Sequence, residues 1–306
     1  MMRKMRVLIT GINGFIGYHV AQKYAKMGHE VIGLDKNSTN DAYKTYAVDM
    51  LNSDLPALLT EIAPNLIIHC AGLANVSYSL QYPDEDFMAN TYMVYHFLES
   101  MRKAGLGNCR FLFLSSAAVY GQPVKLPVCE EDTQCPMSPY ALHKKMAEEI
   151  CTYYITQYQF DIRILRIFST YGPGLKKQVF WDMHQKLART GKLELFGTGN
   201  ESRDYIYIDD LTEAICLIAA DERNDYFVWN VANGTEVTIR EIAEIFVDIK
   251  GIPRDKVLFN GAVREGDPMN WCANIDRLVQ LGYKQKVSIV DGVKAYVDWV
   301  KSERYK

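Results

Sequence analysis

Short apolar stretches alternate with amphipathic stretches through the first half of the chain. The apolar stretches have the length and the β-branched content of buried strands. They occupy residues 7–10, 30–34, 45–49, 65–72, 110–116 and 161–168. The stretches between them repeat apolar positions at helical spacing, which predicts helices over about 15–27, 54–63, 84–104 and 138–158. Because helices of this length suit crossovers between parallel strands, the pattern favours a doubly wound parallel α/β sheet.

The regular alternation ends at the sequence "STYGPGLKK", which begins at residue 169, and the later elements are short and mixed. We expect a first domain of residues 1–172 and a smaller α+β lobe made of residues 173–203 and 232–306. The segment of about 204–231 still has the pattern of a helix and a strand of the large sheet, so we assign it to the first domain. The lobe is expected over the carboxyl edge of the strands, where ligands of open α/β sheets bind.

Composition argues against several kinds of partner. The 306 residues contain 34 Lys and Arg against 37 Asp and Glu, a formal net charge of −3, so no basic field attracts nucleic acid or anionic lipid. The chain has no stretch of about 18 apolar residues and no signal-like N-terminus, and we expect no membrane partner. The seven cysteines lack a CxxC pair or metal-ligand spacing, which favours reduced thiols in the cytoplasm and no metal site.

Glycines recur directly after the first apolar stretch, in "TGINGFIG". A strand followed by glycines and an apolar-periodic segment predicts a strand, a tight turn and a helix N-terminus, which can bind an anion. Gly11 permits the turn, Gly14 lets the backbone approach a pyrophosphate, and Gly17 lets the helix pack on its strand. The same glycines would also suit an ordinary turn in which they serve packing alone.

Asp35 ends the second apolar stretch, eighteen residues after Gly17, where a dinucleotide fold needs a carboxylate for the adenosine ribose. The alternative is that Asp35 caps a turn. A carboxylate here favours NAD, because it would repel the 2′-phosphate of NADP. The neighbouring Lys36 softens that repulsion, so the sequence disfavours NADP without excluding it.

Tyr140 and Lys144 lie four residues apart in "YALHK", in a segment predicted to be helical, so both are expected on one side of one helix. A phenol near an ammonium group ionises more easily and can then accept the proton of an alcohol. The same spacing is also common on solvated helix surfaces. Ser116, however, ends a predicted strand at the sheet edge where a site is expected, and the three residues can together handle one alcohol proton.

Several further motifs match one known family. They are "VDM" (residues 48–50), "HCAGLA" (69–74), "LSSAAVYG" (114–121), "RIFSTYGPG" (166–174), "GTGNESRDYIYIDD" (197–210) and "REGD" (264–267). With these motifs, almost the whole chain resembles the extended short-chain dehydrogenase/reductase family, in its NAD-dependent nucleotide-sugar epimerase/dehydratase branch. The resemblance implies a Rossmann-like domain for NAD, a C-terminal lobe for a nucleotide-diphosphate sugar, and a homodimer through the helices at about 84–104 and 138–158.

The resemblance also implies roles for individual residues. In that family the tyrosine matching Tyr140 takes a proton from a sugar hydroxyl, the serine matching Ser116 hydrogen-bonds the same oxygen, and the lysine matching Lys144 holds the nicotinamide ribose. The residues implied to contact NAD are Gly11, Asn13, Gly14, Phe15, Ile16, Gly17, Asp35, Asp49, Met50, Cys70, Ala71, Gly72, Tyr140, Lys144 and Ile167. Those implied to contact the sugar nucleotide are Ser116, Ser169, Phe196, Arg203, Tyr205, Arg264 and Asp267, with the two arginines on the diphosphate.

The resemblance points to a 4-epimerase that works through a transient 4-keto intermediate. The related 4,6-dehydratases carry an acidic pair directly after the catalytic hydroxyl, whereas this chain has Ala117 and Ala118, whose methyl groups transfer no protons. Ser169 stands where many relatives carry asparagine, and an NAD(P)H-dependent nucleotide-4-keto-sugar reductase is the first alternative. A non-catalytic dinucleotide-binding sensor is the second, although such proteins usually lack the tyrosine or the lysine.

Overall fold

The structure, a computed structural model, describes residues 4–37, 42–223, 225–262 and 268–303. The chain divides into two compact units. The first consists of Met1–Gly121, Thr133–Ile167 and Ile215–Trp229, and the second consists of Gln122–Asp132, Phe168–Ala214 and Asn230–Lys306. This division differs from the expected domain boundaries at residues 122–132, 168–172, 204–214 and 230–231, which lie in the second unit. No helix of the described segments has both the length and the apolar composition needed to cross a bilayer.

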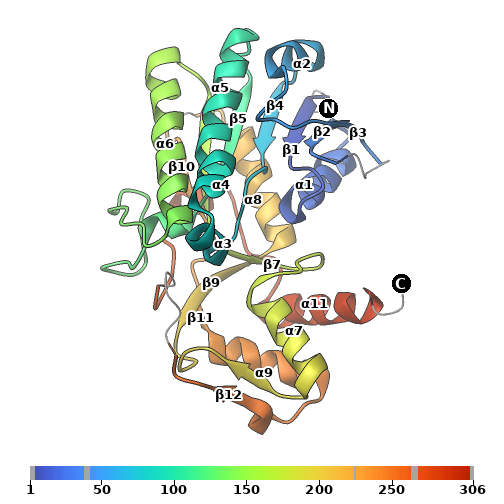
Figure 1. Cartoon of the computed structure of the whole chain (residues 1–306), viewed down its shortest axis with the longest axis vertical. Coiled ribbons are helices and arrows are strands. Elements are labelled where there is room, and N and C mark those ends of the chain that lie inside the picture. The colour runs from blue at the N-terminus through green and yellow to red at the C-terminus, as the bar shows by residue number, and fades with distance from the viewer. Residues whose placement is uncertain (1–3, 38–41, 224, 263–267, 304–306) are drawn as a thin grey trace. The chain divides into compact units, whose positions relative to one another are not determined.

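A seven-stranded sheet forms the centre of the first unit, in the order β10-β6-β5-β4-β1-β2-β3 (Figure 1). Its strands are β1 (Arg6–Thr10), β2 (Glu30–Asp35), β3 (Lys44–Ala47), β4 (Leu66–His69), β5 (Arg110–Ser116), β6 (Ile162–Ile167) and β10 (Val228–Val231). Every adjacent pair from β3 to β6 is parallel, which confirms the expected α/β fold. The order reverses between β1 and β4, so the carboxyl ends of these strands flank the crevice where such sheets bind ligands.

Amphipathic helices connect these strands, and each packs against the sheet because one apolar stripe of its surface is buried there. They are α1 (Phe15–Lys26), α2 (Leu55–Ile62), α3 (Val76–Gln81), α4 (Pro83–Phe87), α5 (Met93–Lys103) and α6 (Pro139–Tyr158). α5 and α6 lie side by side (Figure 1), over a core that includes the fully buried Phe97 and Phe113. The start of α6 is set locally, since the Ser138 hydroxyl accepts the Ala141 N–H and Pro139 occupies the first turn.

The helix expected over about 84–104 is interrupted in the structure. A π-helix (Met88–Tyr92) separates α4 from α5. Within it, the Asn90 amide donates to the Leu73 carbonyl at 2.9 Å and to the Asp86 carboxylate at 3.0 Å. π-Helical turns are rare in proteins, and those that occur are often found at functional sites. The π-helical turn carries Asn90, whose side chain hydrogen-bonds to the loop after β4. The periodicity of the sequence does not reveal this interruption of the helix.

The second unit is an α+β arrangement with two small sheets. Its strands are β7 (Ser169–Tyr171), β8 (Leu193–Leu195), β9 (Ser202–Tyr207), β11 (Glu236–Thr238) and β12 (Val257–Phe259). β9 lies between β7 and β11, and β8 pairs with β12. The helices are α7 (Gln178–Thr190), α9 (Ile239–Lys250), α10 (Asp276–Gln280), α11 (Ile289–Glu303) and α8 (Ile208–Ala220), within which the chain passes from the second unit to the first.

The segment of about 204–231 was expected to hold a helix and a strand of the large sheet, and it holds α8 and β10, which joins that sheet. Its first residues, however, belong to β9 of the three-stranded sheet. The reason lies in Asp204 on β9. Its buried carboxylate accepts the backbone N–H groups of Asn233, Gly234 and Ala273, all in the second unit. A buried carboxylate needs such donors, and the interior of a parallel sheet, whose own N–H groups are already paired, offers none.

Candidate active site

The turn after β1 and the loop after β4 meet at the carboxyl edge of the sheet. Gly11 has a φ of +66°, and a Cβ at this position would lie 2.9 Å from the Ala71 backbone. A Cβ on Gly17 would overlap the Gly11 carbonyl oxygen, so only glycine lets α1 pack this closely on the turn. The two loops therefore form a backbone cradle at the point where the strand order reverses.

The N-terminus of α1 opens onto this turn. Its N-cap is Gly14, which has no side chain to cap the helix, and Phe15 and Ile16 carry backbone N–H groups of the first turn. Asp35 ends β2, and its carboxylate accepts the Asn13 N–H at 3.0 Å. These groups fit a dinucleotide, because N–H groups and the helix dipole suit the diphosphate and a carboxylate suits a ribose.

The other residues expected at the cofactor have mixed environments. The Asp49 carboxylate accepts the Asn52 amide at 2.9 Å, and this hydrogen bond lowers its pKa. Met50 is buried in the apolar core, so its side chain is engaged in packing. Burial raises the pKa of the Cys70 thiol to about 12, and Ile167 lies at the end of β6. We read these positions as backbone and shape contacts around the loops rather than as charged contacts.

β5 and α6 bring the candidate catalytic residues together. Ser116 is the last residue of β5; its hydroxyl accepts the Ala118 N–H at 3.2 Å and lies close enough to Tyr140 to oppose the rise in the pKa of that phenol. One turn further along α6, the Lys144 ammonium donates a hydrogen bond to the Leu114 carbonyl, with 3.0 Å between Nζ and the oxygen. Tyr140 and Lys144 are 8% and 6% exposed, respectively, so neither is a solvated surface residue of the helix.

Burial dominates the protonation of this pair. It raises the pKa of Tyr140 to about 12, against the opposing hydrogen bond of Ser116. It lowers the pKa of Lys144 to about 8, against the opposing charge of Asp86. The sequence led us to expect that Lys144 lowers the pKa of Tyr140. In the structure the ammonium points instead to the Leu114 carbonyl, and the chain alone leaves Tyr140 protonated at neutral pH.

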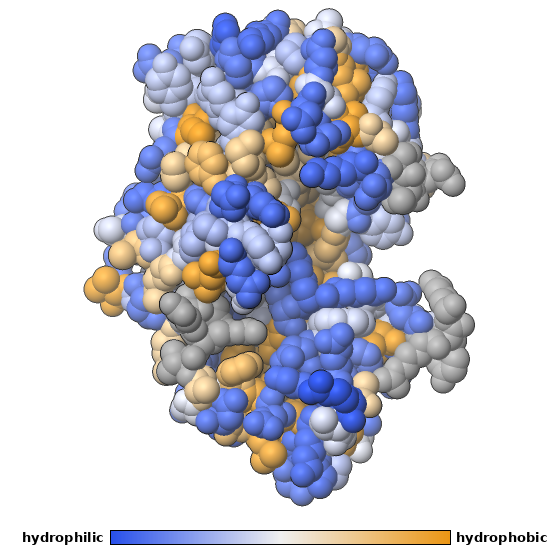
Figure 2. All heavy atoms as spheres, viewed as in Figure 1, coloured by the Kyte–Doolittle hydropathy of each residue, from blue (hydrophilic) through white to orange (hydrophobic). Residues whose placement is uncertain are grey.

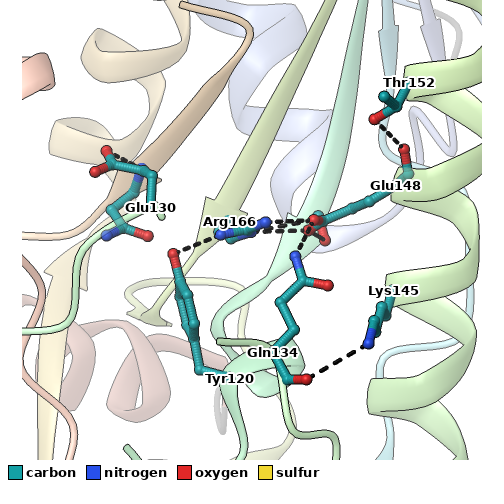
Figure 3. A network of polar contacts seen from close by, with 9 residues as sticks. Tyr120, Glu130, Gln134, Lys145, Glu148, Thr152 and Arg166 are labelled. Atoms are coloured by element: carbon teal, nitrogen blue, oxygen red, sulfur yellow. Dashed lines mark hydrogen bonds and ion pairs between the residues drawn. The ribbon is translucent and has the colours of Figure 1, made fainter. Parts of the chain in front are cut away.

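A buried ion pair ties the elements of the site together (Figure 3). Arg166 on β6 contacts Glu148 on α6, with Nη2 2.7 Å from Oε2 and both side chains 5% exposed. The Ser115 hydroxyl on β5 donates to Glu148 at 2.5 Å, and Arg166 donates to the Tyr120 hydroxyl at 2.8 Å. The network thus joins β5, β6 and α6 beside the catalytic residues. Sequence reasoning did not identify it, because charged residues on separate elements resemble surface positions.

A second buried polar cluster was also missed. Asp86 on α4 is fully buried and contacts the His143 ring nitrogen Nδ1 at 2.7 Å. His143 directly precedes Lys144, and this adjacency was the one available signal. Asp86 itself lies in the sequence "PDEDF", whose clustered charges are typical of a solvated surface.

The candidate substrate residues of the second unit lie on and near β9. Ser169 begins β7 and pairs in register with Tyr205 on β9. Tyr205 is buried, with its ring centroid 5.6 Å from that of Phe180, so it contributes to the aromatic core of this unit. Phe196 is half exposed, and its ring lies beneath the Lys186 ammonium. Of these side chains, Phe196 is the one with a broad face open to a ligand.

Arg203, a residue expected at the diphosphate, lies on β9. Its guanidinium lies 5.4 Å from the centre of the Trp271 ring and donates to the Met269 carbonyl at 3.3 Å. These contacts hold the side chain at the surface of β9. Arg264 and Asp267, the other two residues expected at the substrate, lie outside the described residues.

The model of the NAD dependent epimerase/dehydratase family matches residues 7–232, a span that contains the glycine turn, Asp35 and the candidate catalytic residues. The chain belongs to this family. The resemblance drawn from the motifs is therefore confirmed, and so is NAD as the cofactor.

Similar proteins extend over the whole chain. A putative UDP-glucose 4-epimerase of Methanocaldococcus jannaschii is 31% identical, with 97% of this chain and 98% of that protein covered. The solved structure of a UDP-glucuronic acid 4-epimerase from Bacillus cereus, in complex with UDP-glucuronic acid and NAD, has a TM-score of 0.89 at 26% identity, covering 98% and 100%. An NAD-dependent NDP-hexosamine 5,6-dehydratase involved in tunicamycin biosynthesis has a TM-score of 0.87 at 25% identity, covering 98% of both chains.

We expect NAD to bind more tightly than NADP, by about tenfold or more, because the Asp35 carboxylate accepts from a free 2′-hydroxyl and repels a phosphate. Calorimetric titration with each dinucleotide measures the ratio. Asp35→Ser should narrow it, whereas Asp54→Ser, which removes an exposed carboxylate from the N-cap of α2, should leave it unchanged. Equal or tighter binding of NADP would contradict the assignment and point to Lys36.

Proposed function

We propose that the protein is an NAD-dependent 4-epimerase of nucleotide-diphosphate sugars, and that its substrates are UDP-sugars. The observation that carries the proposal is the placement of Ser116 at the end of β5 and of the buried Tyr140 and Lys144 one turn apart on α6, at the sheet edge beside the Gly11 cradle. The names of the similar 4-epimerases support the choice of UDP-sugars.

The three residues move one proton. Tyr140, once ionised, accepts the proton of the C4 hydroxyl while the C4–O bond becomes a carbonyl, and Ser116 donates a hydrogen bond to that oxygen. Lys144 keeps an ammonium beside the reacting groups, where it suits the nicotinamide ribose that the resemblance assigns to it. When bound, NAD would supply the acceptor for the C4 hydride and the donor for its return to the opposite face of C4. Tyr140 then gives its proton back, so C4 is inverted and no atom is gained or lost.

Elimination of water needs a further acid and base, and the residues beside Ser116 offer neither. Ala117 and Ala118 begin a 3₁₀ helix (Ala117–Tyr120) and carry only methyl groups. Asp86 and Glu148, two buried carboxylates of the same unit, are both bonded to other groups, Asp86 to His143 and Asn90 and Glu148 to Arg166 and Ser115. These features favour epimerisation over the reaction of the similar dehydratase.

The test is an assay of the purified protein with catalytic NAD and a panel of UDP-, GDP-, dTDP- and CDP-sugars. We expect interconversion of a pair of UDP-sugars that differ at C4, without net reduction of NAD. In D₂O the products should contain no deuterium on carbon, because the same hydride returns to C4.

Other outcomes would identify other functions. Stoichiometric oxidation of NAD(P)H by a 4-keto sugar would establish the reductase. Loss of one water from the sugar, with deuterium entering the ring, would establish a dehydratase. NAD binding with no turnover of any sugar would favour the sensor.

We also propose a homodimer through α5 and α6. The face that these helices share is lined by Tyr95, Met146, Tyr153 and Tyr158, and the three tyrosines are 45%, 55% and 43% exposed. Figure 2, viewed from the same side as Figure 1, shows apolar atoms interspersed with polar ones over this region rather than a uniformly polar surface. Amphipathic aromatic side chains of this kind are enriched at protein interfaces. Light scattering on the preparation used for the assay measures the oligomeric state.

A further inference from the structure

The residues around Lys144 include a carboxylate that neither the motifs nor the proposed reaction uses. Asp86 on α4 is 0% exposed. Its oxygen Oδ2 lies 2.7 Å from His143 Nδ1, and its oxygen Oδ1 accepts the Asn90 amide at 3.0 Å. A carboxylate buried without solvent is costly unless both oxygens are bonded, and here both are.

The partners of Asp86 are themselves held in place. The His143 ring packs edge-on against Phe87, with 5.5 Å between ring centroids, and its backbone carbonyl accepts the Thr91 hydroxyl at 2.9 Å. Asn90 donates also to the Leu73 carbonyl in the loop after β4. The cluster therefore ties α4, the π-helix and the loop after β4 to α6 at His143, the residue directly before Lys144.

The same cluster reaches the lysine. A Cβ built on Gly72 would lie 2.8 Å from Asn90 Oδ1 and 3.7 Å from the Lys144 ammonium, so the amide and the ammonium approach the same point over the β4 loop. Asn90 Oδ1 is buried and has no hydrogen-bond partner among the described residues. An acceptor oriented in this way suits the ammonium or a polar group bound beside it.

We propose that Asp86, oriented by His143 and Asn90, is a positioning residue that keeps Lys144 charged and in place for proton transfer at Tyr140. The inference deepens the proposed function and rests on it for its catalytic meaning. The effect of Asp86 on the pKa of Lys144 can be measured without any substrate.

Besides Asp86, four titratable side chains among the described residues interact electrostatically with Lys144. On α6 these are Glu148 and Cys151, and at the end of β4 they are Cys70 and His69. Among the acidic groups that stabilise the ammonium, Asp86 has the largest effect and raises the pKa of Lys144, whereas burial lowers it to about 8. The same negative charge raises the pKa of Tyr140. Removal of the Asp86 charge should therefore lower both pKa values.

The experiment uses the full chain labelled with ¹³C at the lysine Cε, with the Lys144 signal assigned by Lys144→Met. In the native protein this signal should titrate near pH 8. In Asp86→Asn, an isosteric change, the midpoint should fall by about one pH unit. The matched control is Asp84→Asn, which removes an exposed carboxylate from the same helix and should leave the midpoint in place. An unchanged midpoint in folded Asp86→Asn would overturn the proposal.

The second measurement is the pH profile of single-turnover NAD reduction by a nucleotide sugar. Asp86→Asn should move both limbs to lower pH, because Tyr140 ionises earlier and Lys144 loses its proton earlier. A lower rate with unmoved limbs would show a merely structural role and contradict the proposal. If Asp86→Asn does not fold, His143→Ala, which leaves the carboxylate without its donor, should move the Lys144 midpoint upward, and no movement would overturn the inference. Failure of the native protein to interconvert any pair of C4-epimeric sugars would reject the proposed function and leave the titration result standing.

Discussion

Tyr140→Phe is expected to lower kcat by about a thousandfold, with little change in NAD affinity. The substitution removes only the hydroxyl of Tyr140, while the buried ring keeps its place on α6. Without that hydroxyl, no group of the site accepts the proton of the substrate hydroxyl. Initial rates of epimerisation measure the loss, and calorimetric titration with NAD shows that the cofactor cradle is intact.

A matched variant separates this effect from a general perturbation of the helix. Tyr153→Phe removes a hydroxyl from the same helix at an exposed position and should leave kcat unchanged. Retention of more than about a tenth of the native kcat in Tyr140→Phe would assign the proton transfer to another residue.

Glu148→Gln is expected to destabilise the protein by about 3–5 kcal/mol, because it leaves the Arg166 guanidinium buried without its counter-charge. The loss also removes the charged acceptor of the Ser115 hydroxyl, so β5 and α6 lose their common anchor. Urea unfolding, followed by the fluorescence of the buried Trp229 of β10, measures the free energy of unfolding.

The control for this prediction is an exposed pair. Lys294 and Asp298 on α11 are bonded at 2.7 Å with side chains 64% and 51% exposed, and Lys294→Ala should change the free energy of unfolding by less than about 0.5 kcal/mol. A double replacement, Glu148→Leu with Arg166→Met, should recover much of the loss, because a well-packed apolar pair removes both buried charges. Equal, small effects of Glu148→Gln and Lys294→Ala would show that the buried pair does not anchor the site.

Local sequence determined much of the first unit. The order of strands and helices follows from the period of apolar positions, because a strand buried on both faces and a helix buried on one stripe need different patterns. The glycine turn and the start of α6 at Ser138 are equally local, since they depend on φ angles and on hydrogen bonds to residues three positions away. Tyr140 and Lys144 share a helix face for the same reason, which is why the candidate catalytic group could be predicted.

Tertiary structure decided what depends on contacts between distant segments. The spacing of 57 residues between Asp86 and His143 carries no pattern, and a charged residue in "PDEDF" resembles a surface position until the fold buries it. The place of β9 depends on donors about thirty residues away from Asp204, so its apolar pattern alone does not show which sheet it joins. The pKa of Tyr140 likewise reflects burial, which is a property of the folded chain. Local pattern therefore determined which elements form, and long-range burial of polar groups decided how they join and which charges surround the site.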